Sequence, residues 1–206
     1  MTGALAPFLA GWSLMMAAMM LPSAVPIIRL HRLSAVASGW ERELGSAAFV
    51  AGYLLVWSVV GIAVWVAAAA VDALLPAGAQ ALAVAALLMI AGLYQFTPLK
   101  SRCLGACRSP MDFLVTRWRG GAAGALRIGV DHGVYCLGCC WALMTVFVGV
   151  GAMAVTWAAG IAAVVAAEKL LPGGRVLSRA LGLALIAGGA LVLAWPDLAM
   201  LLPAGM

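Results

Sequence analysis

Long apolar runs separated by short polar segments make up most of this sequence. Six of the runs are close to, or above, the length of about 20 residues that a helix needs to cross a bilayer. They cover residues 5–28, 46–71, 78–98, 121–150, 152–170 and 176–202. The runs are continuous and rich in Ala and Leu, unlike the short alternating strands of a membrane β-barrel. The pattern predicts an all-α, polytopic transmembrane helix bundle with six spans, forming a single transmembrane domain over residues 1–206.

The amino-acid composition points to the same class of protein. Hydrophobic residues make up 66% of the 206 residues and charged residues only 9%, against roughly 45–50% and about 25% in soluble domains. The 12 Lys and Arg residues and the 7 Asp and Glu residues cannot cover the surface of a soluble domain of this length. The net charge of +5 then belongs to loops that border lipid, and we expect no nucleic-acid partner.

Basic residues occur only in the first, third and fifth loops between the predicted spans and at the span ends beside those loops. They are Arg29, Arg32 and Arg42, then Lys100, Arg102, Arg108, Arg117, Arg119 and Arg127, then Lys169, Arg175 and Arg179. By the positive-inside rule these loops are cytoplasmic and both termini lie outside, in a bacterial inner membrane. No Lys or Arg precedes Arg29, so the charged start of a cleaved signal peptide is missing and we expect the first span to be retained. The third loop, at about residues 100–120, is the longest hydrophilic segment.

The run at residues 121–150 carries one histidine and three cysteines at helical spacing. On a helix, Cys136 and Cys139 lie within about 40° of His132, and Cys140 lies about 80° from it. Imidazole nitrogen and thiolate sulfur are ligands that Zn(II), Cu(I) and other soft or borderline ions prefer. The spacing therefore predicts a metal site within the membrane. The competing interpretation is that cysteine serves here as a small apolar residue, which is commonly buried.

Methionines gather near the middle of the first predicted span. They are Met15, Met16, Met19 and Met20, which form two pairs spaced four residues apart. Thioethers bind Cu(I) well and Zn(II) poorly, and this cluster has a depth similar to that of Cys136, so the two sulfur clusters are candidates to face each other. Methionine is equally a flexible packing residue, and that interpretation stays open.

Two further cysteines lie in the third loop. Cys103 and Cys107 fall on one side of a helical turn, and the neighbouring Lys100, Arg102 and Arg108 favour their thiolate forms. A permanent disulfide is not expected in a reducing cytoplasm. The functional options are metal capture, completed by ligands from elsewhere, or reversible redox chemistry. The alternative is a reduced and idle pair.

Two acidic residues lie in the predicted spans or at their inner ends. An ionisable group in the hydrocarbon costs at least about 2.5–3.5 kcal/mol at the centre, so it normally has a partner or a function. Asp131 and Glu168 lie toward the cytoplasmic side and are candidates to meet there. The alternative is ordinary ion pairing, of Asp131 with Arg127 and of Glu168 with a basic residue of the cytoplasmic rim such as Lys169.

Several of these motifs together resemble a known family. The motifs are Met-Met-Ala-Ala-Met-Met-Leu-Pro22, Pro98-Leu-Lys100, Cys103, Cys107-Arg108-x-Pro110, Gly133-x-Tyr135-Cys136-Leu-Gly-Cys139-Cys140-Trp141-x-Leu-Met144 and Glu168-Lys169. The chain is similar over about residues 10–172 to a bacterial family of predicted metal-binding integral membrane proteins, described as a domain of unknown function. The resemblance implies a multi-helix membrane protein with metal ligands among these Cys, His, Met and Glu positions. It identifies neither a metal nor an activity.

The sequence thus favours a membrane protein that handles a soft transition metal as a carrier or metal centre, with copper preferred over zinc or iron. The expected ligands are Cys136, Cys139, Cys140, His132, Met15, Met19, Cys103, Cys107 and Glu168, supported by Asp131, Tyr135, Met16, Met20 and Lys100. The expected partners are the lipid bilayer and the metal ion, with a second copy of the chain or an accessory metal-delivery protein as further candidates.

Two other functions stay open. One is a membrane thiol-redox or metal-dependent oxidoreductase, although the vicinal Cys139 and Cys140 seldom form a relaxed disulfide. The other is a non-catalytic assembly subunit. The sequence contains no Walker-type glycine loop and no Ser/His/Asp arrangement, so ATP-driven transport and ordinary hydrolysis are not supported, and no catalytic residue is assigned.

Overall fold

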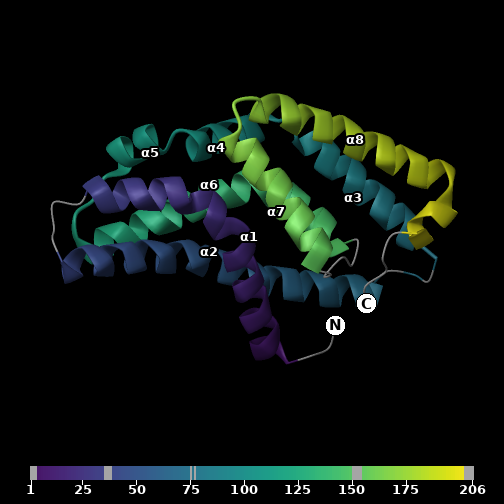
Figure 1. Ribbon diagram of the computed structural model, residues 1–206. Helices are drawn as coiled ribbons and strands as arrows, with labels where there is room; N and C mark the ends of the chain where they lie inside the picture. Colours follow the sequence, from purple (N-terminus) through teal and green to yellow (C-terminus); the bar gives the residue numbers. More distant parts are fainter. Residues whose placement is uncertain (1–3, 35–38, 75, 77, 150–154, 202–206) are drawn as a thin grey trace. The chain divides into compact units, whose positions relative to one another are not determined.

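The computed structural model describes residues 4–34, 39–74, 76, 78–149 and 155–201. Within these residues the chain forms eight α-helices and one short 3-10 helix, and no strand (Figure 1). The elements are α1 (Leu5–Ser34), α2 (Trp40–Leu74), α3 (Gln80–Tyr94), α4 (Pro98–Arg108), α5 (Pro110–Arg117), α6 (Gly121–Gly149), α7 (Val155–Leu170), α8 (Gly174–Ala194) and η1 (Pro196–Leu201). The predicted all-α fold is confirmed.

Four helices are long and apolar enough to cross a membrane, namely α1, α6, α8 and the part of α2 at Trp40–Val71. Helix α3 has only 15 residues and continues into α4 across a bend of 63°, so this pair is either a broken span or a re-entrant loop. Helix α7 has 16 residues, and at 1.5 Å per residue it reaches about 24 Å, short of the roughly 30 Å hydrocarbon core. The prediction of six spans is therefore not confirmed, and the start of the fifth predicted run, at residues 152–154, lies outside the described residues.

The third loop is helical, although its sequence is hydrophilic. Proline begins each of its two helices, at Pro98 and Pro110. Proline suits the first turn of a helix because that turn does not need its N–H. Gly121 follows the loop with a φ of 74°, a left-handed conformation that glycine adopts without strain, and it begins α6. The sequence thus divides this segment into two short helices, which bring Cys103, Phe113 and Arg117 to defined positions.

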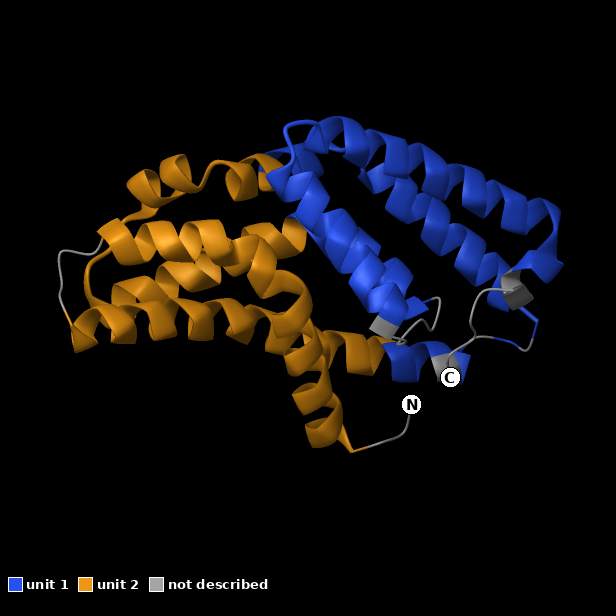
Figure 2. Cartoon of the chain, in the orientation of Figure 1, with its two compact units in different colours: residues 1, 68–102, 139–206 blue, residues 2–67, 103–138 orange. Residues whose placement is uncertain are grey.

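The chain divides into two compact units (Figure 2). Unit 1 comprises residues 1, 68–102 and 139–206, and unit 2 comprises residues 2–67 and 103–138. In unit 1, α3 packs along α8, and their backbones approach closely at Gly92 and Gly182, where an added Cβ would meet the other helix. Small residues at a helix contact permit such an approach.

Two glycines bring α2 and α6 together in unit 2. A Cβ at Gly52 of α2 would collide with the Leu126 carbonyl of α6, and a Cβ at Gly129 of α6 would collide with the Phe49 carbonyl of α2. Only glycine allows both backbones to approach this closely. The contact brings the aromatic side chains of α2 beside His132, one turn further along α6.

Candidate metal centre

The buried centre of unit 2 holds His132 and Cys136, one helical turn apart on α6. Their side chains are 3% and 0% exposed. The imidazole ring lies among Phe49 and Tyr53 of α2 and Phe113 of α5, with ring centroids 6.2, 5.8 and 5.3 Å from its own. The Tyr53 hydroxyl and the Cys136 thiol are joined by a hydrogen bond of 2.9 Å. An imidazole, a thiol and a phenol are therefore gathered in otherwise aromatic surroundings.

Cys139 and Cys140 continue the same helix into unit 1. Both side chains are buried. The Cys139 carbonyl oxygen accepts a hydrogen bond of 2.5 Å from Lys100 Nζ. All four predicted α6 ligands are thus buried, and their metal role stays a prediction.

The two loop cysteines lie in different surroundings on α4. Cys103 is buried, and its Sγ lies against the backbone of α6 at Gly138, where a Cβ at position 138 would come within 2.5 Å of it. Cys107 is half-buried. Cys103 therefore lies against Gly138 of α6, which comes two residues after Cys136 in the sequence. Cys107 is nearer the surface.

The methionine run lies in unit 2 on α1, a helix that contains two prolines. Met16, Met19 and Met20 are buried, and Met15 is half-buried. The side chains are therefore inside the bundle, as both packing and thioether ligation require. The expectation that this run faces the cysteines of α6 stays a prediction.

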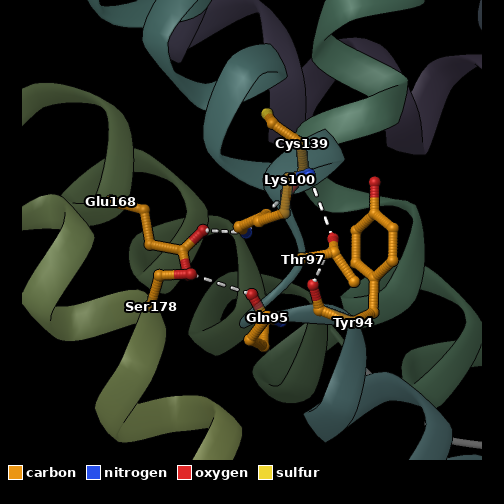
Figure 3. Close-up of polar contacts among 7 residues, drawn as sticks. All are labelled: Tyr94, Gln95, Thr97, Lys100, Cys139, Glu168 and Ser178. Atoms are coloured by element: carbon orange, nitrogen blue, oxygen red, sulfur yellow. Dashed lines mark hydrogen bonds and ion pairs between the residues drawn. The ribbon is translucent and has the colours of Figure 1, made fainter.

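A buried ion pair joins α4 to α7 in unit 1 (Figure 3). Lys100 Nζ and Glu168 Oε2 are 2.7 Å apart, and both side chains are 1% exposed. Glu168 thus pairs with Lys100 from the third loop. Since a buried charge without its partner is strongly destabilising, each residue is needed for the burial of the other. The metal role of Glu168 stays a prediction.

Further hydrogen bonds surround the break between α3 and α4 (Figure 3). Thr97 Oγ1 donates to the Tyr94 carbonyl at 2.8 Å and accepts from the Lys100 amide at 3.2 Å. Ser178 Oγ of α8 donates to Gln95 Oε1 at 3.0 Å. Thr97 and Gln95 Oε1 are thereby bonded within unit 1, while Gln95 Nε2 has no hydrogen-bond partner among the described residues.

Asp131 has a partner that local spacing did not indicate. Its Oδ2 lies 3.7 Å from Nη1 of Arg117 on α5, not in an ion pair with Arg127 one turn away. Arg117 also donates to the Tyr135 hydroxyl at 2.6 Å, and its guanidinium lies over the rings of Phe113 and Tyr135. Asp131 belongs to unit 2 and Glu168 to unit 1, so the expected meeting of these two carboxylates stays a prediction.

The second histidine of the chain was not among the predicted site residues. His31 of α1 is buried, and its ring lies 5.5 Å from those of both Phe49 and Trp118. Its Nδ1 has no hydrogen-bond partner among the residues that the structure describes. The sequence could have pointed to His31 because the chain has only two histidines. It gave no sign of Tyr53 or Phe113, because their role depends on the contacts of α6 with other helices.

The donor chemistry of the buried pair suits a soft cation with few protein ligands. The described residues contain no group of three or more His, Cys, Asp or Glu side chains placed to hold a metal ion. Structural zinc sites almost always use about four ligands. Cu(I) prefers sulfur and accepts imidazole, so His132 and Cys136 fit Cu(I) by residue type.

A family model described as PpoB2, a copper chaperone, matches residues 9–192. No curated protein and no solved structure matches the chain. The matched region contains every residue predicted above as a ligand or as supporting one.

Proposed function

The chain belongs to the PpoB2 family of copper chaperones, and from this premise we propose that it is an integral membrane protein that binds Cu(I) through sulfur and imidazole ligands within its bundle. In this proposal copper is the cargo, held by the chain until a partner protein receives it. The family match supports the metal, and the four long apolar helices support the membrane location.

The observation that carries the ligand assignment is the burial of His132 beside Cys136 and the Tyr53 hydroxyl. A Cys136 thiolate and Cu(I) carry opposite unit charges, so their complex is neutral and its burial costs far less than that of an ion. Zn(II) or Fe(II) at the same pair would leave a net positive charge among aromatic rings. The Tyr53 hydroxyl can donate to the thiolate, and the charge-assisted hydrogen bond stabilises it.

The remaining sulfur groups would supply further binding steps. We assign the methionines of α1 to one end of a path and Cys103 and Cys107 to its cytoplasmic end, with Cys139 and Cys140 as further thiol ligands on α6. Thioethers and thiolates are both ligands of Cu(I), which permits graded affinities along one route. Glu168 is assigned to holding Lys100, since the two form an ion pair at 2.7 Å.

The test is anaerobic titration of the purified full-length protein in detergent with Cu(I) against a coloured Cu(I) chelator. The wild type is expected to bind copper in stoichiometric amounts, and C136S to lose about tenfold or more in affinity, as changes around metal ligands typically do. Ala125→Ser is the matched control because it adds the same hydroxyl at another buried position of α6 in unit 2. Wild-type protein without copper affinity, or C136S equal to A125S, would overturn the proposal.

A further inference from the structure

An open pocket of about 340 Å³ lies between α4, α5 and α6 in unit 2. Its lining residues are Gly105, Ala106, Ser109, Asp112, Phe113, Thr116, Arg117 and Tyr135. This volume is at the lower end of the range for small-molecule sites, which is about 300–1,000 Å³. It suits a ligand of small-molecule size.

Phe113 contacts both this pocket and the buried histidine. It lines the pocket, and its ring meets the His132 ring edge-on at a centroid distance of 5.3 Å. The ring of Tyr53 stacks on the same histidine at 5.8 Å, and its hydroxyl bonds to Cys136. A rotation of Phe113 would therefore change the contact between the pocket and the candidate ligands.

The polar groups of the pocket favour an anionic ligand. Arg117 contributes its guanidinium, which is partly exposed and lies 3.7 Å from the Asp131 carboxylate. Ser109 makes no capping hydrogen bond to the helix that follows it, so its hydroxyl is available to a ligand. Asp112 also lines the pocket, but it is the one acid in the segment at residues 100–120, whose basic residues include Arg102, Arg108, Arg117 and Arg119. A basic surrounding of this kind attracts anions.

We propose that this pocket binds a small anionic Cu(I)–thiolate complex, and that Phe113 is the movable partition past which the ion is exchanged with Cys136. The inference rests on the proposed function and adds the form in which copper arrives or leaves. A bond from Cu(I) to the small thiolate breaks as a bond to the Cys136 sulfur forms. The Cys136 thiol proton passes to the departing thiolate, and copper remains Cu(I), so no electron moves.

The partition is tested without any metal. In the full chain with Cys136 as the sole cysteine, the rate of modification by a small anionic methanethiosulfonate is measured. The reagent should react about tenfold or more faster in F113A than in the parent. Phe49→Ala is the control, because Phe49 also contacts His132 but does not line the pocket, and its rate should stay near that of the parent. Equal acceleration in both variants would overturn the proposal.

If the sole-cysteine chain does not fold, the same comparison is made in the wild-type background by mass spectrometry of the peptide that contains Cys136. This readout is independent of copper binding. If the chain binds no copper but Cys136 is modified faster in F113A, the proposed function alone is refuted. If the chain binds copper and the modification is not faster in F113A, the partition alone is refuted.

The ligand class is tested by the rate of copper transfer from two donors. Transfer from the anionic glutathione complex should slow about tenfold in R117Q, whereas transfer from the cationic acetonitrile complex should not. A purely structural role of Arg117 would slow both equally and would overturn the assignment of an anionic ligand. Transfer from a protein donor but from neither small complex would also overturn it.

Discussion

At the scale of single residues, helical spacing predicted which α6 side chains share a face, and it could not predict what meets them. His132 and Cys136 were expected together because four residues make about one turn, and both are buried. Tyr53, Phe113 and Arg117 come from other helices, and their contacts with α6 depend on packing that no local pattern encodes. The same limit explains why local spacing offers Arg127 as an ion-pair candidate for Asp131 and gives no sign of Arg117.

The hydroxyl of Tyr53 is expected to tune the copper affinity of Cys136. Tyr53→Phe removes the 2.9 Å hydrogen bond to the sulfur, and a bond to a charged thiolate contributes about 1.5–3 kcal/mol. Chelator competition should therefore show a loss of about tenfold or more. Tyr135→Phe is the matched control, since that hydroxyl bonds to Arg117. Equal affinities for Y53F and the wild type would argue against a thiolate ligand at position 136.

The Lys100–Glu168 pair is expected to stabilise the fold only as a pair. Lys100→Met leaves the Glu168 carboxylate buried alone and should cost about 3–5 kcal/mol, whereas K100M combined with E168L should restore much of that loss. Thermal unfolding in detergent measures both variants. The exposed pair of Arg32 and Glu43, with side chains 51% and 59% exposed, provides the control, because E43Q should cost less than about 1 kcal/mol. A K100M variant as mild as E43Q would contradict the buried geometry.

At the scale of elements, the apolar runs predicted where helices form, while lengths and breaks depended on turn chemistry. The run at residues 78–98 becomes α3 with a break before Pro98, and the hydrophilic third loop becomes two helices begun by prolines. A proline marks a helix start as readily as it ends one. The fifth run yields the 16-residue α7, so an apolar run was a reliable sign of a helix but not of a full span.

The contact of α2 with α6 is expected to depend on glycine. Gly129→Leu forces a side chain into the Phe49 carbonyl of α2, and overpacking of this kind costs about 1–3 kcal/mol. It should also lower copper affinity by displacing Tyr53 from Cys136. Gly11→Ala is the control because nothing lies within 4 Å of its added Cβ, and alanine favours the helix by about 0.5–1 kcal/mol. Thermal unfolding and chelator competition are the measurements, and a harmless G129L would refute the close approach.

At the scale of the whole molecule, the predicted orientation in the membrane rests on the distribution of the basic residues. The basic residues all lie in or beside the first, third and fifth loops of the predicted six-span arrangement, whereas the structure supports four spans by length, or five with the bent pair. The positive-inside rule predicts the side on which these charges lie because it concerns loops. It could not decide whether α7 and the α3–α4 pair cross fully, because this depends on the surrounding bilayer.

Orientation is tested with paired reporters fused within the chain. A reporter active only in the cytoplasm should give signal after Arg119 and none after Ala79, and a reporter active only outside should give the reverse. The positive-inside rule predicts this result for any arrangement in which the α3–α4 pair crosses the membrane and the third loop lies inside. Cytoplasmic signal at both positions would mean that the α3–α4 pair, which lies between them in the sequence, does not cross the membrane.

The contact of Cys103 with Gly138 links two positions that are 35 residues apart in the sequence. The thiol lies 2.5 Å from the place where any larger residue at 138 would put its first carbon, so position 138 cannot be enlarged in a variant library unless Cys103 shifts or is replaced. A larger residue at 138 would demand a smaller one at 103, and the thiol would then be lost. Directed evolution that enlarges position 138 would therefore remove one of the predicted sulfur ligands, Cys103.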